Sequence, residues 1–413
     1  MINRVTKMPV SPTHTQNPDK ALNTSSWFFM GILGALMAFT SLSTDIYLPA
    51  MPQMAQELNG NVELTVTGFL AGFALAQLIW GPMSDRIGRK IPLFIGMILF
   101  VIGSIGCALS QSIEQIVFWR VFQALGACTG PMLGRAMIRD LYGRTQAAQM
   151  LSTLMVIMAI APIAGPLLGG QIIKFSTWHS IFWLLASIGG LMFLTLFFLP
   201  ETHPVEKRTK ASVINTFTNY HQLLGNWQFM RYTLCVTFFY VAAFTFIVGS
   251  PFVYISFYGV DAQHYGWLFA LNIVGVMGLS FINRNLVKRF SLDHLLKCTT
   301  AIATIALITL CILFYEQVGG IYSIIVMVFI FFSMNGMIAA NSTAAALDGV
   351  PGMAGSASAL IGSLQYGSGI ISSLLLAWLS TGTPQTMIVI MTIFTVLSAS
   401  MIFIIQPMKE IKF

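Results

Sequence analysis

Charged side chains are scarce in this chain of 413 residues: Lys, Arg, Asp and Glu make up 8%, while 56% of the residues are hydrophobic. An average soluble domain is about 25% charged. So little polar surface cannot cover a soluble core of this size. Histidine is also rare, and all six histidines fall in expected tails, loops or span ends. The composition therefore excludes a soluble globular protein and indicates a membrane protein.

Signatures of several enzyme classes are missing too. The chain has no HExxH, no GxSxG and no P-loop, which argues against a membrane hydrolase and against ATP hydrolysis. The five cysteines show no paired spacing, so we expect neither disulfides nor a metal site. The net charge of +7 lies in short loops between apolar runs, which argues against nucleic acid as a partner. We expect a protein that is not an enzyme and needs no cofactor.

Long apolar runs recur from one end of the chain to the other. Each is about 20 residues long, enough to cross a bilayer as a helix, and lipid-exposed backbone must satisfy its own hydrogen bonds. The expected fold is an all-α membrane protein with twelve transmembrane helices. The predicted spans are 27–50, 64–82, 92–110, 115–137, 148–172, 179–200, 229–254, 265–283, 295–315, 320–346, 354–380 and 386–406.

A polar stretch at 201–228 divides the spans six and six. The loop after span 2, GPMSDRIGRK, has a weak echo after span 8, NRNLVKRF, which favours an architecture of two repeated halves. Nearly all loop Lys and Arg residues fall on the side of the N-terminus, which predicts that both termini are cytoplasmic. The predicted units are a disordered tail (1–26), an N-terminal half (27–200), a cytoplasmic linker (201–228), a C-terminal half (229–406) and a tail (407–413).

Two charges lie deep inside the expected spans: Asp45 in span 1 and Arg120 in span 4. A charge in hydrocarbon is costly and is kept mainly where it has a partner, a wet cavity or a function. Burial favours the neutral form of Asp45, so we predict that Asp45 carries protons; a structural hydrogen bond is the alternative. Arg120 could act on Asp45, bind an anionic substrate group or hydrogen-bond helix carbonyls, and these alternatives stay open.

Aromatic and isolated polar residues within the spans predict a cargo site with aromatic walls and a few orienting groups. Each polar residue could instead form a hydrogen bond between helices. The candidate substrate-binding residues are Phe69, Phe73, Gln77, Gln123, Tyr240, Phe244, Tyr254, Asn272, Asn335, Asn341, Gln365 and Tyr366.

The short loop GPMSDRIGRK (81–90) holds one acid among three basic residues, and its glycines permit a tight reversal. We predict a conformational switch there; a loop that only fixes topology is the alternative. Its residues are Gly81, Asp85, Arg86, Gly88, Arg89 and Lys90.

Span 5 combines prolines, which bend a helix, with glycines, which let helices approach closely. We predict a kinked, closely packed helix that prevents leak between the halves; simple kinking is the alternative. Its residues are Pro162, Gly165, Pro166, Gly169 and Gly170.

These stretches resemble one family. The loop at 81–90 is similar to motif A of the major facilitator superfamily, FWRVFQALGA (118–127) to its motif B, and APIAGPLLGG (161–170) to the motif C of proton-coupled exporters. Together with STDIYLPAMP (43–52) and SPFVYISFYGV (250–260), they resemble the Bcr/CflA group of drug:H⁺ antiporters. The chain departs from this pattern at the opening glycine of motif C, which is Ala161 here, and at a frequent arginine, which is His179.

The resemblance implies two pseudosymmetric six-helix halves that rock about a central cavity, with Asp45 and Arg120 in proton coupling. It implies a multi-pass protein of the bacterial inner membrane that exports small amphipathic antibiotics, chloramphenicol- or bicyclomycin-like, by antiport with protons. The expected partners are small-molecule drugs, protons and the lipid bilayer, and we expect a monomer. The alternative is a proton-coupled or passive metabolite or siderophore transporter of the same fold.

Overall fold

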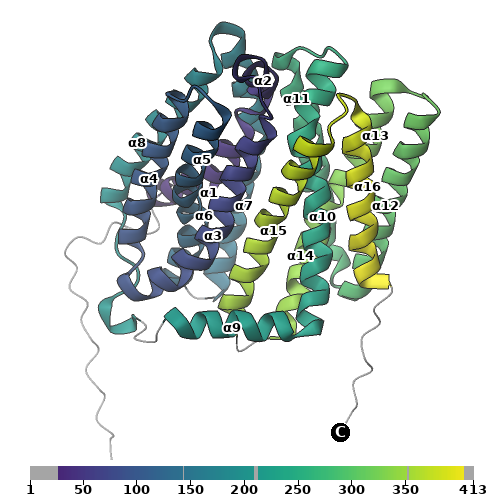
Figure 1. The fold of residues 1–413 in the computed structure, drawn as a ribbon. Helices are drawn as coiled ribbons and strands as arrows, with labels where there is room; N and C mark the ends of the chain where they lie inside the picture. Colours follow the sequence, from purple (N-terminus) through teal and green to yellow (C-terminus); the bar gives the residue numbers. More distant parts are fainter. Residues whose placement is uncertain (1–26, 143, 209–212, 351–352, 404–413) are drawn as a thin grey trace, which may run out of the picture.

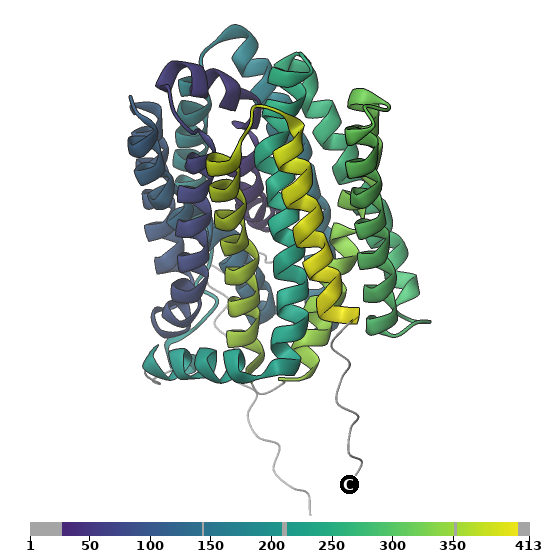
Figure 2. The same ribbon diagram turned by 45° about the vertical axis from the view of Figure 1, so that its right-hand side comes forward.

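The computed structural model describes residues 27–142, 144–208, 213–350 and 353–403, so the predicted tails 1–26 and 407–413 lie outside the described residues. Within the described part, helices stand side by side in one bundle (Figures 1 and 2). Twelve candidate spans are long and apolar enough to cross a membrane. The predicted all-α fold with twelve transmembrane helices is confirmed, and the chain is a multi-pass membrane protein.

The N-terminal half occupies the left of Figure 1 and holds spans 1 to 6. Its elements are α1 (Trp27–Asp45), η1 (Leu48–Ala50), α2 (Met51–Leu58), α3 (Glu63–Ile87), α4 (Lys90–Ala108), α5 (Ile113–Ala127), α6 (Thr129–Leu141), α7 (Arg144–Phe175), α8 (Trp178–Thr195) and η2 (Leu196–Phe198).

The C-terminal half follows a linker that contains η3 (Val205–Lys207) and α9 (Val213–Gly225). Helix α9 lies across the bottom of the bundle in Figures 1 and 2, where it contacts α3, α10 and α15. The elements of this half are α10 (Trp227–Pro251), η4 (Phe252–Phe257), α11 (Ala262–Leu286), α12 (Leu292–Tyr315), α13 (Gly320–Ser333), α14 (Asn335–Asp348), α15 (Ala354–Leu379) and α16 (Pro384–Phe403).

Spans 1, 4, 7 and 10 are each built from successive helical segments: α1–η1–α2, α5–α6, α10–η4 and α13–α14. Pro49 and Pro251 account for two of these changes, because proline removes a backbone donor and clashes with the preceding turn. These four spans stand three apart, as repeated three-helix units would produce, while span 6 also ends in a separate short segment, η2. Interrupted backbone is tolerated at membrane depth where protein or water surrounds it, which suits spans that line the centre of the bundle.

The bundle has a linker end, at α9, and an opposite end, at α2 (Figure 1), where η4 contacts α2. At the opposite end Asn61 donates to the Ala377 carbonyl at 3.2 Å, and the hydroxyls of Thr67 and Ser373 lie 2.6 Å apart, so α3 is joined to α15. Gly170 of α7 packs against the backbone of Ala262 at the start of α11. The two halves therefore meet along both α3–α15 and α7–α11 at this end.

The contact of α3 with α15 continues midway along α3, where Ser363 donates to the Ala74 carbonyl at 3.0 Å. Tyr220 of α9 also reaches the Leu78 carbonyl of α3 at 3.4 Å. On the other side of the bundle, Met155 of α7 and Met277 of α11 are exposed. The packing between α7 and α11 is thus concentrated at the opposite end.

Candidate functional site

Asp45 ends α1, just before the interruption of span 1, and its side chain is 6% exposed. Helix α7 approaches closely here: a Cβ on Gly165 would lie 3.3 Å from the Cβ of Asp45, and a Cβ on Gly169 would collide with the Ile46 carbonyl. Tyr265 of α11 and Tyr366 of α15 lie within electrostatic range of the carboxyl group. Asp45 is therefore a buried acid at the junction of the two halves, and the span 5 glycines are what bring α7 against it.

Arg120 lies in α5 and is fully buried. Its Nη1 donates to the Ser43 carbonyl at 3.1 Å and to Gln123 Oε1 at 2.6 Å. The guanidinium also stands over the rings of Tyr47 and Phe69, 4.3 and 4.5 Å from their centroids, contacts that favour a cation. Aromatic faces and carbonyl oxygens thus stabilise this charge.

Two atoms of the Arg120 guanidinium, Nε and Nη2, have no hydrogen-bond partner among the described residues. Asp45 lies within electrostatic range of Arg120, but no ion pair joins these two residues. The arginine therefore has donors free for a carboxylate that approaches in another state of the protein.

Gln123 is also fully buried. Its amide accepts from Arg120 and donates to Ser104 Oγ at 2.7 Å, and Ser104 in turn donates to the Phe100 carbonyl. The structure places this predicted substrate-binding residue in a hydrogen-bonded chain between α5 and α4, within the N-terminal half.

Five of the predicted substrate-binding residues lie together in a chain of rings that we call the aromatic bridge. Ring centroids are 6.2 Å apart for Phe69–Phe73, 4.2 Å for Phe73–Tyr366, 6.1 Å for Phe244–Tyr366 and 6.0 Å for Tyr240–Phe244. The bridge runs from α3 through α15 to α10, so it spans both halves. Aromatic side chains at such distances offer large apolar surfaces to a small ligand.

The amides among the predicted residues fall into two groups. Asn341 exchanges two hydrogen bonds with Asn283, at 3.0 and 3.2 Å, and so ties α14 to α11 inside the C-terminal half. Asn272 and Asn335 each keep a buried side-chain oxygen without a partner, which leaves an acceptor available in α11 and in α14. Gln365 is half-buried on α15, next to Tyr366.

Two further predicted residues lie beside the aromatic bridge. Gln77 is buried and would contact a side chain placed at Gly362, so it fills the space between α3 and α15. Tyr254 lies in η4 with its ring 6.3 Å from Tyr265, toward the opposite end of the bundle.

The loop at 81–90 forms a network that we call the latch. Arg89 is buried and its guanidinium binds Asp85 at 2.6 Å, Asp140 of α6 at 2.9 Å and Ser84 at 2.7 Å. Burial opposes the charge, but the hydrogen bonds to Asp140 and Asp85 raise the pKa of Arg89 above its ordinary value. The latch holds the linker ends of α3 and α6 together.

Glu201, beyond the end of span 6, completes the latch. Its carboxylate accepts the backbone N–H groups of Arg89 at 2.9 Å and Lys90 at 3.1 Å, where α4 begins. Gly88 has φ +97°, and a Cβ added to it would lie only 2.5 Å from Oε2 of Glu201. Both the backbone conformation and the lack of space therefore require glycine there. Sequence reasoning identified Asp85 and Arg89 but missed Asp140 and Glu201, whose only signal was an acid directly after a span.

Sequence reasoning also missed Arg135, which lies in α6 within span 4. The predicted span 4 (115–137) contains Arg135 two residues before its end, and only Asp45 and Arg120 were singled out as charges deep inside spans. The helix continues to Leu141, so Arg135 lies more than one turn inside the span.

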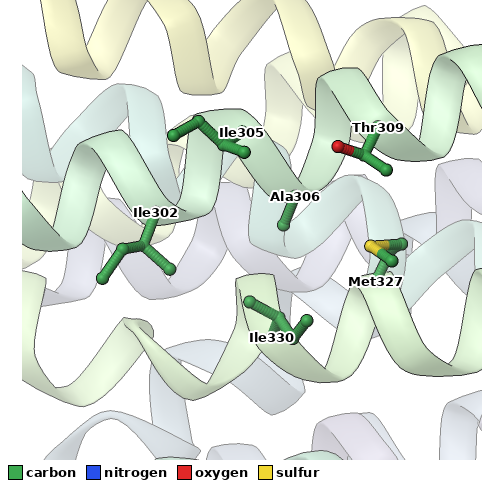
Figure 3. Close-up of a pocket in the computed structure, with 6 residues that line it drawn as sticks. All are labelled: Ile302, Ile305, Ala306, Thr309, Met327 and Ile330. Carbon is green, nitrogen blue, oxygen red and sulfur yellow. The ribbon is translucent and has the colours of Figure 1, made fainter.

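A pocket of about 290 Å³ lies between α12 and α13, lined by Ile302, Ile305, Ala306, Thr309, Met327 and Ile330 (Figure 3). The Thr309 hydroxyl is the single polar side-chain group among these six residues. The pocket belongs to two neighbouring helices of one half and contains none of the predicted site residues, so it does not fit the predicted cargo site.

Comparison with known proteins agrees with this architecture. The chain is 30% identical to a bicyclomycin resistance protein homolog of Haemophilus influenzae, covering 91% of this chain and 95% of that one, and 36% identical to the MFS-type transporter YdgK of Bacillus subtilis, covering 87% and 91%. It is 30% identical to multidrug resistance protein D of Escherichia coli, covering 86% and 89%. Among solved structures, the xylose transporter XylE from E. coli superposes with a TM-score of 0.70 at 15% identity, covering 94% and 100%, which supports the fold alone. The family model described as Major Facilitator Superfamily matches residues 32–373, and the chain belongs to this superfamily of transporters.

Proposed function

We propose that this transporter exports small amphipathic compounds, chloramphenicol- or bicyclomycin-like, in exchange for protons, with Asp45 as the proton carrier. The observation that carries the proposal is the position of Asp45, a buried carboxyl group where α1, α7, α11 and α15 meet. Relatives named for bicyclomycin and multidrug resistance support the cargo class. The aromatic bridge supplies apolar surface shared by both halves, which suits such a cargo.

The mechanism uses competition between a proton and the cargo. With the opposite end closed, cargo enters from the linker end, which we assign to the cytoplasm of a bacterial inner membrane because the loop arginines and lysines gather there. Asp45 gives up its proton on this side, and the resulting carboxylate is attracted by the free Nε and Nη2 donors of Arg120. Rocking of the halves then exposes cargo to the opposite side, where Asp45 is protonated again.

The energetics limit what one proton can do. One elementary charge crossing a potential of about 100 mV supplies about 2.3 kcal/mol, and a pH gradient adds to this. A single carrier at Asp45 therefore supports a modest concentration gradient of a neutral compound.

The test uses everted membrane vesicles that contain the protein and an acidic lumen. Adding chloramphenicol or bicyclomycin to the wild type should release protons from the lumen. Asp45→Asn should abolish this release, because an amide cannot carry the proton, while exchange of labelled drug across the membrane persists. Asp261→Asn removes an exposed acid between spans 7 and 8 and serves as the matched control, with release equal to the wild type.

Proton release by Asp45→Asn at the wild-type rate would disprove the carrier assignment. Drug exchange by the wild type without any proton release would instead favour the passive transporter of the same fold.

A further inference from the structure

Arg135 is a second arginine inside span 4, and the proposed proton coupling does not use it. Its Nε donates to the Pro131 carbonyl at 2.9 Å, one turn earlier on the same helix. The two terminal nitrogens of its guanidinium have no hydrogen bond or ion pair with any residue that the structure describes. Three or more N–H donors of a permanent cation are therefore available.

The surroundings of Arg135 combine protein and solvent. Its side chain is exposed, although Cys128 of its own span and Tyr366 of α15 lie within electrostatic range of its charge. Arg135 thus combines an exposed side chain with a residue of the other half in electrostatic range, so it lies beside the boundary between the halves and is open to a ligand. Tyr240 and Tyr366 are likewise only partly buried on helices of the C-terminal half.

Among the residues that the structure describes, no acid forms an ion pair with Arg135. The groups that act on Arg135 electrostatically are Tyr366, Cys128 and the further cation Arg139, while the nearby acids Asp85 and Asp140 are bound to Arg89 in the latch. An unbalanced cation within a membrane span is costly and marks a functional position. This differs from Arg120, whose charge is enclosed by carbonyls and aromatic rings.

Arg135 also lies next to the aromatic bridge. Tyr366 belongs to the bridge, 4.2 Å from Phe73, and it lies within electrostatic range of both Arg135 and Asp45. Tyr366 therefore brings an aromatic ring of the bridge within electrostatic range of the cation as well as of the buried acid.

We propose that Arg135 is an anion-binding group of the cargo site, which accepts the carboxylate of an amphipathic organic acid whose apolar body lies on Phe73 and Tyr366. This inference rests on the proposed function and narrows its cargo class. The planar fork of a guanidinium matches the two oxygens of a carboxylate, which adds geometric specificity to the attraction of opposite charges. Neutral amphipathic compounds use the aromatic surface alone, and lipophilic cations are repelled.

The test compares two ligands with one apolar body. 1-Naphthylacetate and 1-naphthylacetamide differ in the charge of the head group and hardly in shape. Their affinities are measured by calorimetry for the full chain in phosphatidylcholine nanodiscs, where the lipid carries no net charge. The ratio of the two affinities does not depend on the fraction of active protein, so a partly misfolded variant still gives a valid answer.

We expect the wild type to prefer the acid by about tenfold, the equivalent of about 1.4 kcal/mol. Arg135→Gln should reduce this preference to near unity by weakening acid binding, with amide binding unchanged. Arg135→Lys should retain part of the preference, because it keeps the charge and loses the fork. Arg139→Gln removes a charge one turn further along α6 and should keep the full preference.

Equal affinity of the wild type for acid and amide, or a preference that survives Arg135→Gln, overturns this inference. The drug-export proposal survives both of these results, because amide binding still reports a working cargo site. Absence of binding by either compound contradicts both proposals.

Discussion

Arg120 shows how a buried cation can be accommodated without an acid in contact. Its charge is shared among the Ser43 carbonyl, the Gln123 amide oxygen and the faces of Tyr47 and Phe69. Each of these groups would lose its partner if the arginine were shortened. Asp45 lies near enough to be influenced by the charge, so one side chain serves both the packing of the N-terminal half and the proposed coupling.

Truncation of Arg120 should therefore destabilise the protein as well as inactivate it. Arg120→Ala leaves buried acceptors unpaired, at about 1–3 kcal/mol each, and also loses the cation–ring contacts. We expect a clearly lower thermal unfolding midpoint in detergent. Arg284→Ala, at an exposed arginine at the linker end of α11, should change stability by about 0.5 kcal/mol or less. An unchanged midpoint for Arg120→Ala would mean that these contacts do not stabilise the fold.

At the scale of the element, hydropathy predicted the twelve spans but not how they are built. The interruption of span 1 had a signal in Pro49, and that of span 7 in Pro251. The change from α13 to α14 at Met334 has no proline; it depends on packing among helices, which a single sequence does not reveal. The aromatic bridge could be predicted as a set, because its residues share helix faces.

The latch marks the limit of prediction from local sequence. Asp85 and Arg89 lie four residues apart in one short loop sequence, so proximity along the chain alone suggested their ion pair, although α3 ends at Ile87, between them. Asp140 and Glu201 lie 51 and 112 residues from Arg89, and no spacing rule connects them. Arg135 was missed for a related reason, since the end of a span cannot be located to within one helical turn from hydropathy.

The latch also predicts a pH dependence through Glu201, which accepts the first N–H groups of α4. Partial burial opposes its charge, but these bonds, the N–H of His203 and the charge of Arg208 lower the pKa of Glu201 below its ordinary value of 4.5. Its contribution to stability is therefore complete above pH 4.5 and is lost as the pH falls through the lowered pKa.

The thermal unfolding midpoint of the wild type should thus fall on acidification from roughly pH 4.5 to pH 3. Glu201→Gln should be less stable at neutral pH and lose part of this acid dependence. Glu206→Gln, at an exposed acid of η3, provides the control and should follow the wild-type curve. Parallel curves for the wild type and Glu201→Gln would show that the capping interaction does not contribute.

At the scale of the whole molecule, the two halves are held together unevenly. Side chains of α3 and α15 bond along much of their length, from Asn61–Ala377 at the opposite end to Ala74–Ser363 further along. Helices α7 and α11 meet at the opposite end, where Gly170 packs against Ala262 and Gly266 against Leu167. A rocking motion must open the opposite end, so the contacts there have to break in every transport cycle.

A reversible crosslink across the halves should therefore stop transport. The hydroxyls of Thr67 and Ser373 lie 2.6 Å apart between α3 and α15, so Thr67→Cys with Ser373→Cys places two thiols within reach of a disulfide. Oxidation should reduce counterflow of a compound that the wild type carries to the level of vesicles without the protein, and a reductant should restore it.

A crosslink within one half provides the control. Ser398→Cys places a thiol beside Cys235, whose Sγ lies 3.5 Å from Ser398 Oγ. Because α10 and α16 belong to the same half, we expect them to move together. Counterflow should survive that second disulfide. If transport continues with the Thr67–Ser373 crosslink confirmed by mass spectrometry, the opposite end does not open during the cycle, and alternating access by rocking of the two halves fails for this protein.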